Sequence, residues 1–212
     1  MEILRLLKAA FTLPEGVNLA RDPFRTLIVT VISQNTANVN THRAFENLSK
    51  RFPITPEALG TASVEEIEEC LKVAGLYKNK SKVLRDLSRI VLQRFSGSLD
   101  FIYSMSLDKA RKTLMDLPGI GPKTADVVLL FCASKPTVPV DTHVNRVSKR
   151  LRLASSNADY EGVRQPLQAL YPPRDYLSVH LLLISLGRKY CKARNTLCKQ
   201  CPVNSLCPSR RE

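Results

Sequence analysis

Four cysteines close to the end of the 212-residue chain constrain its fold most strongly, because all four fall within seventeen positions. They are Cys191, Cys198, Cys201 and Cys207, with six, two and five residues between successive members. The segment around them is rich in Lys and Arg. Four thiolates this close together are the ligand set of a zinc ion or an iron–sulfur cluster. The sequence therefore predicts that this segment folds around one metal centre.

The remaining two cysteines, Cys70 and Cys132, lie far from that segment in apolar helical contexts. This uneven distribution argues against a secreted disulfide framework and for a reducing compartment. The first residues, MEILRLLKAAF, have an acidic second position and no small-residue cleavage site, and they predict an amphipathic helix in place of a signal peptide. No apolar stretch reaches the ~18–20 residues needed to span a bilayer.

The charge of the chain is strongly unbalanced. Lys and Arg number 32 against 19 Asp and Glu, which gives a net charge of +13 and a pI near 9.7. Such an excess indicates a polyanionic partner, most often nucleic acid. The alternative is a basic protein without such a partner.

Helix signals recur along the chain, whereas alternating strand patterns of useful length do not occur. Asp22 and Thr55 each precede a proline and are predicted N-caps, and Ser63 with Glu66 forms a predicted capping box. Apolar residues recur at helical spacing from Lys80 to Phe95. Further helices are expected over Leu107–Leu117, Pro122–Ser134, Asp159–Leu170 and Tyr176–Tyr190 and after Asp141, and Pro136–Val140 is expected to be a connector. The predicted fold class is all-α.

The motif LPGIGPKTA joins two of these helices into a hairpin over Ser106–Ser134. Gly119 and Gly121 flank Ile120, which is expected to plug the turn into the core. The two glycines would permit a tight turn with unusual backbone dihedrals and let a phosphate approach the amides that open the second helix. An ordinary helical hairpin is the alternative on these residues alone.

Lys123 follows the turn directly. With Pro122 at the first helical position, Lys123 is at the second, where the helix dipole, unpaired amides and partial burial all disfavour an ammonium. A neutral amine is the nucleophile that Schiff-base chemistry requires. The alternatives are a solvated lysine or an ion pair with Asp126.

Eighteen residues beyond Lys123, Asp141 opens the segment VDTHVNRV. A carboxylate before a helix is stabilised as an anion by the N-terminal amides. An anion suits the stabilisation of an oxocarbenium-like sugar cation. Asp141 would also serve as a plain N-cap, and one residue can do both.

LPGIGPKTA, VDTHVNRV and Cys-x6-Cys-x2-Cys-x5-Cys, in this order, resemble the endonuclease III family, the iron–sulfur branch of the helix-hairpin-helix DNA glycosylases. The similarity covers nearly the whole chain. It implies that Lys123 is the nucleophile, that Asp141 is its catalytic partner, and that the four cysteines hold a [4Fe–4S] cluster in preference to zinc.

Other positions carry over from the same resemblance. Gln34, in VISQNT, matches a glutamine that enters the space left by an extruded nucleotide, and Leu76, in GLYKNKSK, matches an apolar wedge beside it. A core position is the alternative for Leu76. His143 is expected near DNA, and Lys192 and Arg194 are expected to face phosphates. The chain departs from many bacterial members at Ala37, where an acidic residue is common. The resemblance therefore does not fix the identity of the excised base.

We expect two helical lobes with the active site in the cleft between them. One lobe would run from 22 to 135, with the helix-hairpin-helix at 106–134. The other would combine 1–21 with 136–212 and carry the cluster loop at 191–207. The predicted protein is a prokaryotic, cytoplasmic, nucleoid-associated monomer without a membrane partner.

The predicted function is that of a bifunctional DNA glycosylase and abasic-site lyase of base excision repair. It would remove oxidised pyrimidines from double-stranded DNA and cleave abasic sites by β-elimination. The alternatives are a mismatch-thymine or oxidised-purine glycosylase of the same superfamily, and a non-catalytic DNA-binding module.

Overall fold

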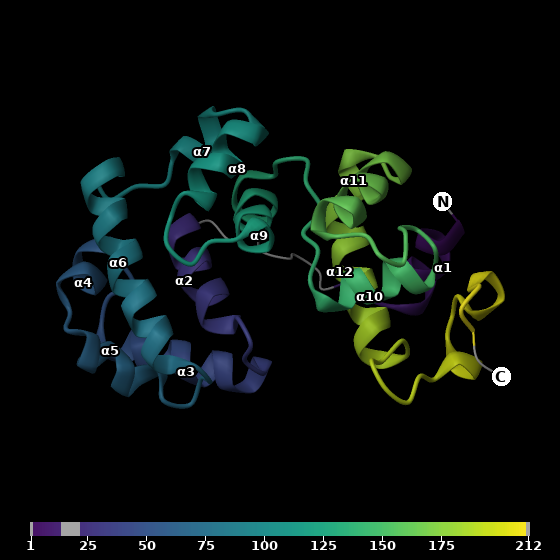
Figure 1. Cartoon of the computed structure of the whole chain (residues 1–212), viewed down its shortest axis with the longest axis horizontal. Coiled ribbons are helices and arrows are strands. Elements are labelled where there is room, and N and C mark those ends of the chain that lie inside the picture. The colour runs from purple at the N-terminus through teal and green to yellow at the C-terminus, as the bar shows by residue number, and fades with distance from the viewer. Residues whose placement is uncertain (1, 14–21, 211–212) are drawn as a thin grey trace. The chain divides into compact units, whose positions relative to one another are not determined.

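The computed structural model describes residues 2–13 and 22–210, and every regular element in these ranges is a helix (Figure 1). The all-α prediction is confirmed. The α-helices are α1 Glu2–Ala10, α2 Pro23–Ser33, α3 Asn38–Arg51, α4 Pro56–Thr61, α5 Val64–Leu71, α6 Tyr77–Phe95, α7 Phe101–Ser104, α8 Leu107–Met115, α9 Pro122–Ala133, α10 Thr142–Arg150, α11 Tyr160–Leu170 and α12 Tyr176–Lys189. Three 3-10 turns are η1 Pro173–Asp175, η2 Cys198–Gln200 and η3 Asn204–Leu206.

Contacts divide the chain into two compact units. We call Ala20–Ala133 the hairpin unit, and Met1–Leu19 with Ser134–Glu212 the C-terminal unit. Residues 1, 14–21 and 211–212 of the predicted lobes lie outside the described residues. The predicted lobe boundary after Lys135, and the cleft between lobes, stay predictions.

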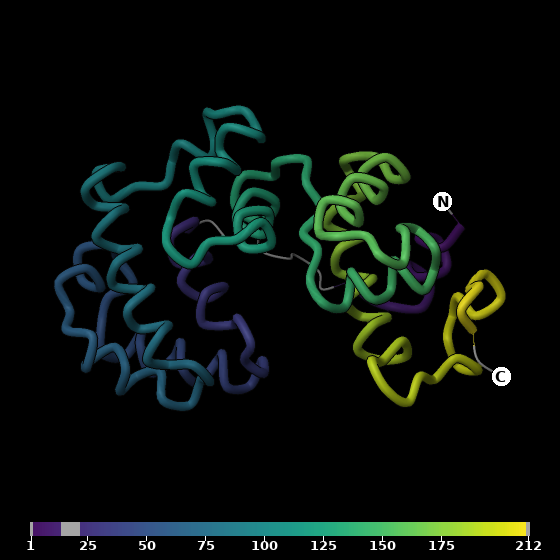
Figure 2. Tube along the Cα trace, viewed as in Figure 1, coloured from purple at the N-terminus to yellow at the C-terminus, as the bar shows by residue number. Residues whose placement is uncertain are grey.

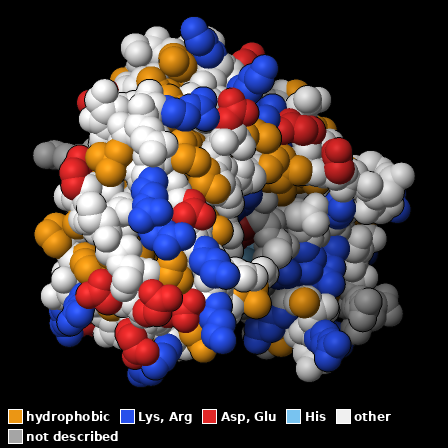
Figure 3. All heavy atoms as spheres, turned by 60° about the vertical axis from the view of Figure 1, so that its left-hand side comes forward, with side chains coloured by type: hydrophobic (Ala, Val, Ile, Leu, Met, Phe, Trp, Pro, Cys, Tyr) orange, Lys and Arg blue, Asp and Glu red, His pale blue; other side chains and the backbone are white. Residues whose placement is uncertain are grey.

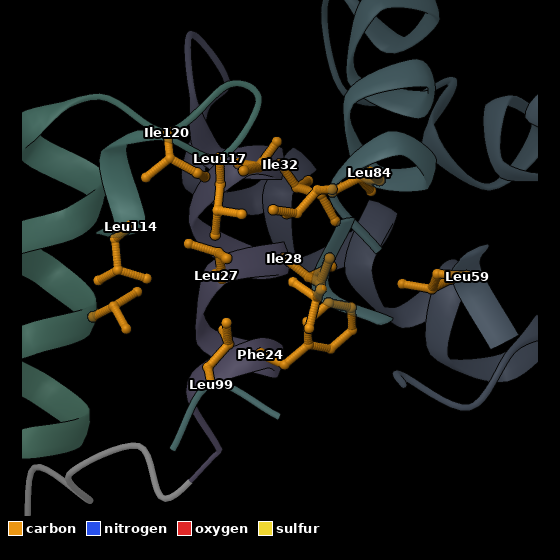
Figure 4. Close-up of a cluster of buried hydrophobic side chains, with 14 of the residues drawn as sticks. Phe24, Leu27, Ile28, Ile32, Leu59, Leu84, Leu99, Leu114, Leu117 and Ile120 are labelled. Carbon is orange, nitrogen blue, oxygen red and sulfur yellow. The ribbon is translucent and has the colours of Figure 1, made fainter. Parts of the chain in front are cut away.

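The hairpin unit is built around side chains from α2 and the helices that surround it. Leu27, Ile28 and Ile32 of α2 are completely buried and lie among leucines of α4, α6 and α8 (Figure 4). Burying one such side chain contributes about 1.5–3 kcal/mol relative to leaving it in water. Helix α6 packs against α4 and α5, while α2 packs against α9. These contacts fix the start of α9, where Lys123 lies.

The helix starts of this unit follow the cap chemistry that the sequence predicts. Asp22 accepts a hydrogen bond from the Arg25 amide at 3.0 Å, and Thr55 accepts one from the Ala58 amide at 3.2 Å. Ser63 and Glu66 form both hydrogen bonds of a capping box. Each cap satisfies amides that the helix leaves unpaired and contributes about 1 kcal/mol.

In the C-terminal unit, α12 packs against α10 and α1. The predicted N-terminal amphipathic helix is confirmed as α1, which buries Leu4 and Leu7. Lys8 binds the Asp175 carboxylate at 2.7 Å. Pro136–Val140 is neither helix nor strand, as expected for a connector. Beyond α12 the cysteine segment, yellow in the trace of Figure 2, is a loop that carries only η2 and η3.

Lys and Arg side chains are spread over the face drawn in Figure 3, where Asp and Glu side chains are interleaved with them. Within the described ranges, none of the helices combines the length and the apolar character that crossing a membrane requires.

The hairpin turn differs in one respect from the sequence expectation. Gly119 has φ +74°, and a Cβ atom there would lie 2.5 Å from Cγ1 of Val83 on α6. Gly121 has no positive φ, and a Cβ atom there would meet nothing within 4 Å. Ile120 is buried in the core, as predicted. Only Gly119 therefore has the unusual dihedral, while Gly121 leaves open space in front of α9.

This contrast predicts different stabilities for two alanine variants. Gly119→Ala should lower the free energy of unfolding by roughly 1–3 kcal/mol, because alanine disfavours the left-handed backbone and its Cβ collides with Val83. Gly121→Ala should leave it unchanged or raise it by up to about 1 kcal/mol. Urea denaturation followed by circular dichroism measures both, and equal losses in the two variants would contradict the account.

Candidate active site and cysteine loop

Lys123 is the second residue of α9, as the sequence predicts, and its side chain is partly buried. The helix is held to α8 by an ion pair in which the Asp126 side chain is fully buried and the Arg111 side chain is 15% exposed. Arg111 of α8 donates to both carboxylate oxygens of Asp126, from Nε at 2.9 Å and from Nη2 at 3.3 Å. A paired, desolvated carboxylate is costly to displace. The pair thus fixes the first turns of α9 and the backbone that carries Lys123.

Asp141, in the C-terminal unit, is the N-cap of α10, as the sequence predicts. Its Oδ1 accepts hydrogen bonds from the amides of His143 at 2.8 Å and Val144 at 2.7 Å. Both bonds fall on the same oxygen, so the described residues supply no hydrogen bond to Oδ2. The carboxylate also lines a cavity of about 260 Å³ together with Asn145 and Tyr160. One oxygen therefore holds the carboxylate at the start of α10, and the other has no hydrogen-bond donor among the described residues.

Gln34 is the C-cap of α2, and the structure brings it to the hairpin turn. Its Nε2 donates to the Gly119 carbonyl at 3.1 Å and lies 3.4 Å from the Thr124 hydroxyl. Gln34 is separated from these partners by 85 and 90 positions in the sequence. The turn and the loop after α2 therefore form one surface of the hairpin unit.

Leu76 is the N-cap of α6, and its side chain is 59% exposed. The interpretation of Leu76 as a core residue is wrong. Its backbone has φ +60°, a conformation that a leucine rarely adopts. Exposed apolar side chains on strained backbone are concentrated at functional sites. Leu76 therefore combines an exposed apolar side chain with an unusual backbone conformation, and its expected role as a wedge stays a prediction.

Lys80 is a buried cation that the sequence reasoning did not single out. It is 5% exposed, and its Nζ donates to the Ile32 carbonyl at 2.8 Å and to the Thr36 hydroxyl. Burial lowers the pKa of Lys80. A signal was available, since Lys80 falls on the same helical face as Leu84, Leu87 and Val91, where an apolar residue is expected.

His143 is in the first turn of α10 and is partly buried. Its Nδ1 lies 3.1 Å from Nη2 of Arg146. Burial lowers the pKa of His143. The Asp141 carboxylate raises this pKa, whereas the Arg146 and Arg188 guanidinium groups lower it further. Of the other two histidines, His42 is exposed, and His180 is buried with Nδ1 2.8 Å from the Pro139 carbonyl. His42 is thus a surface residue and His180 a packing residue.

The four C-terminal cysteines line one cavity of about 260 Å³, and none of them forms a disulfide. Arg150 lies at this cavity, with Nη1 3.4 Å from Cys191 Sγ and 2.7 Å from the Lys192 carbonyl. Lys192 and Arg194 are exposed in the same loop. Over residues 2–13 and 22–210, no three His, Cys, Asp or Glu side chains are grouped so as to hold a metal ion.

Cys70 and Cys132 belong to the hairpin unit, apart from this loop. Burial raises the pKa of both thiols, which leaves them in the unreactive protonated form. Their separation from the four cysteines agrees with the sequence analysis.

Comparisons with known proteins identify the family. Residues 28–173 match the model described as HhH-GPD superfamily base excision DNA repair protein. Endonuclease III of Sulfolobus acidocaldarius is 33% identical over 188 residues, which cover 88% of this chain and 82% of that protein. Endonuclease III of Escherichia coli K12 is 33% identical over 187 residues, which cover 87% and 83%.

Solved structures of related proteins support the same family assignment. A trapped endonuclease III–DNA covalent intermediate superposes with a TM-score of 0.85 at 30% identity, covering 97% of this chain and 92% of that one. A thermostable thymine-DNA glycosylase shares the fold, with a TM-score of 0.78 at 23% identity and coverage of 98% and 92%. The chain thus belongs to the HhH-GPD superfamily of base excision repair proteins and, within it, to the endonuclease III family of DNA glycosylases with abasic-site lyase activity. The predicted family and enzyme class are confirmed.

The lowered pKa of Lys80 predicts a pH-dependent stability. Between that lowered pKa and the ordinary value of 10.5, the unfolded chain holds a proton that the folded chain has lost. The contribution of the Lys80 amine to the free energy of unfolding therefore rises with pH across that range, and it is lost when the pH falls below the lowered pKa of the folded protein. In Lys80→Met the contribution is absent, so the difference in unfolding free energy, native minus variant, should increase as pH rises from about 8 to 10.

Denaturant unfolding at a series of pH values measures this difference. Lys82→Met removes an exposed amine from the same helix and should give a difference that stays flat over the same range. A flat profile for Lys80→Met as well would show that burial does not shift the proton equilibrium of this amine.

Proposed function

We propose that the protein removes oxidised pyrimidines from double-stranded DNA and cleaves the resulting abasic strand, with Lys123 as the nucleophile and Asp141 as its carboxylate partner. The observation that carries this proposal is the position of Lys123 at the second residue of α9, directly after the glycine turn. The likeness to an endonuclease III trapped as a covalent DNA intermediate supports an amine nucleophile.

In the proposed reaction the Nζ lone pair of Lys123 attacks C1′ of an extruded nucleotide. The N–C1′ bond forms as the glycosidic bond breaks, and the base leaves with the bonding electrons and takes up a proton. Opening of the sugar ring and loss of an amine proton give a Schiff base. The Schiff base acidifies C2′, and loss of that proton expels the 3′ phosphate by β-elimination.

Asp141 would act at the first of these steps. Base departure leaves positive charge on the sugar, which a nearby carboxylate stabilises electrostatically. The two amides on Oδ1 hold the group in place, and Oδ2 has no donor in the part of the chain that the structure describes. The proposal requires Lys123 and Asp141 to reach the same deoxyribose.

Gln34 and Leu76 would enter the duplex when the nucleotide leaves it. Unstacking a nucleotide costs a few kcal/mol, which inserted side chains offset in part. The exposure of Leu76 supports this role for the leucine. The hydrogen bond from Gln34 to the Gly119 carbonyl supports a role for the glutamine beside the turn.

The DNA backbone would be held without sequence readout. The open space in front of Gly121 lets a phosphate approach the amides of the turn and of α9. Lys192 and Arg194 are exposed cations on the cysteine loop and would add phosphate contacts. His143, next to Asp141, would contact DNA from α10.

The residues of the cysteine loop fit a [4Fe–4S] cluster. Four thiols without disulfides surround one cavity, and a guanidinium lies beside Cys191 to offset negative charge. A cluster needs its thiolates spread around a core wider than one ion, which favours it over a single zinc. Bound there, the cluster would cross-link the loop that displays Lys192 and Arg194.

Replacement of the nucleophile tests the reaction type. Lys123→Ala should abolish the borohydride-trappable cross-link to abasic DNA, because no amine remains to form the imine. Binding to the same DNA should weaken by only a few fold, since one partly buried side chain is lost. A cross-link of full yield from the variant, measured on denaturing gels, would refute the assignment.

Replacement of the carboxylate tests the second role. Asp141→Asn keeps an oxygen that can cap α10 but removes the negative charge. Single-turnover base removal should slow by about 10²–10³-fold, the cost of losing one electrostatic stabiliser of a transition state, while DNA affinity changes little. Thermal unfolding provides the control, because the retained cap should keep the melting temperature close to the native value. An unchanged rate would count against the carboxylate.

A further inference from the structure

Three loops meet at one end of the hairpin unit. The loop after α2 contains Gln34, the turn before α6 contains Leu76, and the hairpin turn contains Gly119. The Asn35 carbonyl lies 3.7 Å from where a Cβ atom of Gly75 would be, and Gln34 Nε2 lies 3.1 Å from the Gly119 carbonyl. The loop after α2 therefore lies against the turn before α6 through its backbone and against the hairpin turn through the Gln34 side chain.

Lys80 is the side chain that ties two of these loops together. Its amide donates to the Leu76 carbonyl at 3.1 Å, so Lys80 belongs to the helical turn that Leu76 opens. Its Nζ reaches across to the Ile32 carbonyl in the last turn of α2 and to the Thr36 hydroxyl just past Gln34. The Lys80 amine thus binds one residue before Gln34 and one residue after it, from the helical turn that begins at Leu76.

Both loops are strained, which explains why they need a fixed support. Asn35 has φ +52° and Leu76 has φ +60°, and neither is a glycine. A leucine rarely adopts this conformation, which asparagine tolerates better, and such residues persist where their surroundings hold them. The three-donor ammonium of Lys80 supplies such a hold to one loop directly and to the other through its own helix.

Stability alone does not account for a buried lysine here. Among the described residues Lys80 has no carboxylate partner, and its recorded hydrogen bonds go to a carbonyl and a hydroxyl. Burial of an unpaired cation is costly, and apolar residues of similar volume often serve equally well for stability. The favourable placement is at the last carbonyls of α2, where the helix dipole attracts a cation.

We propose that Lys80 is a positioning residue that sets the Gln34 loop and the Leu76 turn in register for joint insertion into the duplex. The inference rests on the proposed function, because the insertion of Gln34 and Leu76 that Lys80 would support is part of that function. Lys80 touches neither sugar nor base in this account. It acts on the step that keeps the damaged nucleotide outside the helix.

The test compares duplex and single-stranded substrates with the cluster-loaded enzyme. In a duplex, the abasic sugar must be held out of the stack, whereas in a single strand no gap needs filling. Lys80→Met should slow imine formation with a duplex abasic site by about ten- to a hundredfold, the usual effect of misplacing a positioning group. The rate with the same abasic site in a single strand should stay within about twofold of native.

Two further variants sharpen the result. Thr36→Val removes one acceptor of the Lys80 amine and also the donor to the Gln34 carbonyl at 3.2 Å, without altering side-chain shape. Both lost hydrogen bonds support the Gln34 loop, so the variant should slow the duplex reaction alone, by a smaller factor than Lys80→Met, even if Lys80→Met folds poorly. In a Gln34→Ala background, Lys80→Met should cause a smaller additional loss than in the native chain, because only Leu76 is left to insert. Lys50→Met removes an exposed amine of α3 and should match the native enzyme on both substrates.

Each outcome decides between explanations. Equal slowing on duplex and single strand would show that Lys80 supports only the overall structure, and it would overturn the inference. Unchanged duplex rates in both Lys80→Met and Thr36→Val would do the same. Absence of imine formation by the native enzyme on both substrates would overturn the proposed function itself.

Discussion

The close packing of the glycine turn against α6 is the contact on which the end of the hairpin unit that carries Gln34, Leu76 and Gly119 depends. Gly119 approaches Val83 so closely that no Cβ atom fits between them, and its carbonyl accepts the hydrogen bond from Gln34. The turn leads directly into α9 and Lys123. The same helix, α6, begins at Leu76 and carries Lys80. A single helix thereby sets the position of the glycine turn, of Leu76 and of the loop after α2.

The two proposed catalytic groups share one local environment, the first turn of a helix, with opposite consequences for their charge. Unpaired amides and the helix dipole favour an anion and disfavour a cation. Asp141 receives two amide hydrogen bonds on Oδ1. Lys123, at the second residue of α9, is placed where an ammonium gains least. The amides at a helix N-terminus would thus favour an anion at Asp141 and a neutral, nucleophilic amine at Lys123.

Features encoded by neighbouring residues could be predicted from the sequence, and features made by distant contacts could not. The caps at Asp22, Thr55, Ser63 and Asp141 each depend on residues within three positions, so the pattern alone shows them. The exposure of Leu76 and the burial of Lys80 depend on how α2, α6 and the hairpin meet. The helical periodicity of Lys80–Phe95 did not show that Lys80 is buried, because its acceptors, the Ile32 carbonyl and the Thr36 hydroxyl, lie more than 40 positions away in the sequence.

The covalent step is tested most directly by locating the bond itself. Native enzyme would be reduced with borohydride on abasic duplex DNA, digested with a protease, and the DNA-linked peptide sequenced by mass spectrometry. The account predicts that the reduced sugar is attached to Nζ of Lys123. Attachment to any other amine of the chain would contradict it.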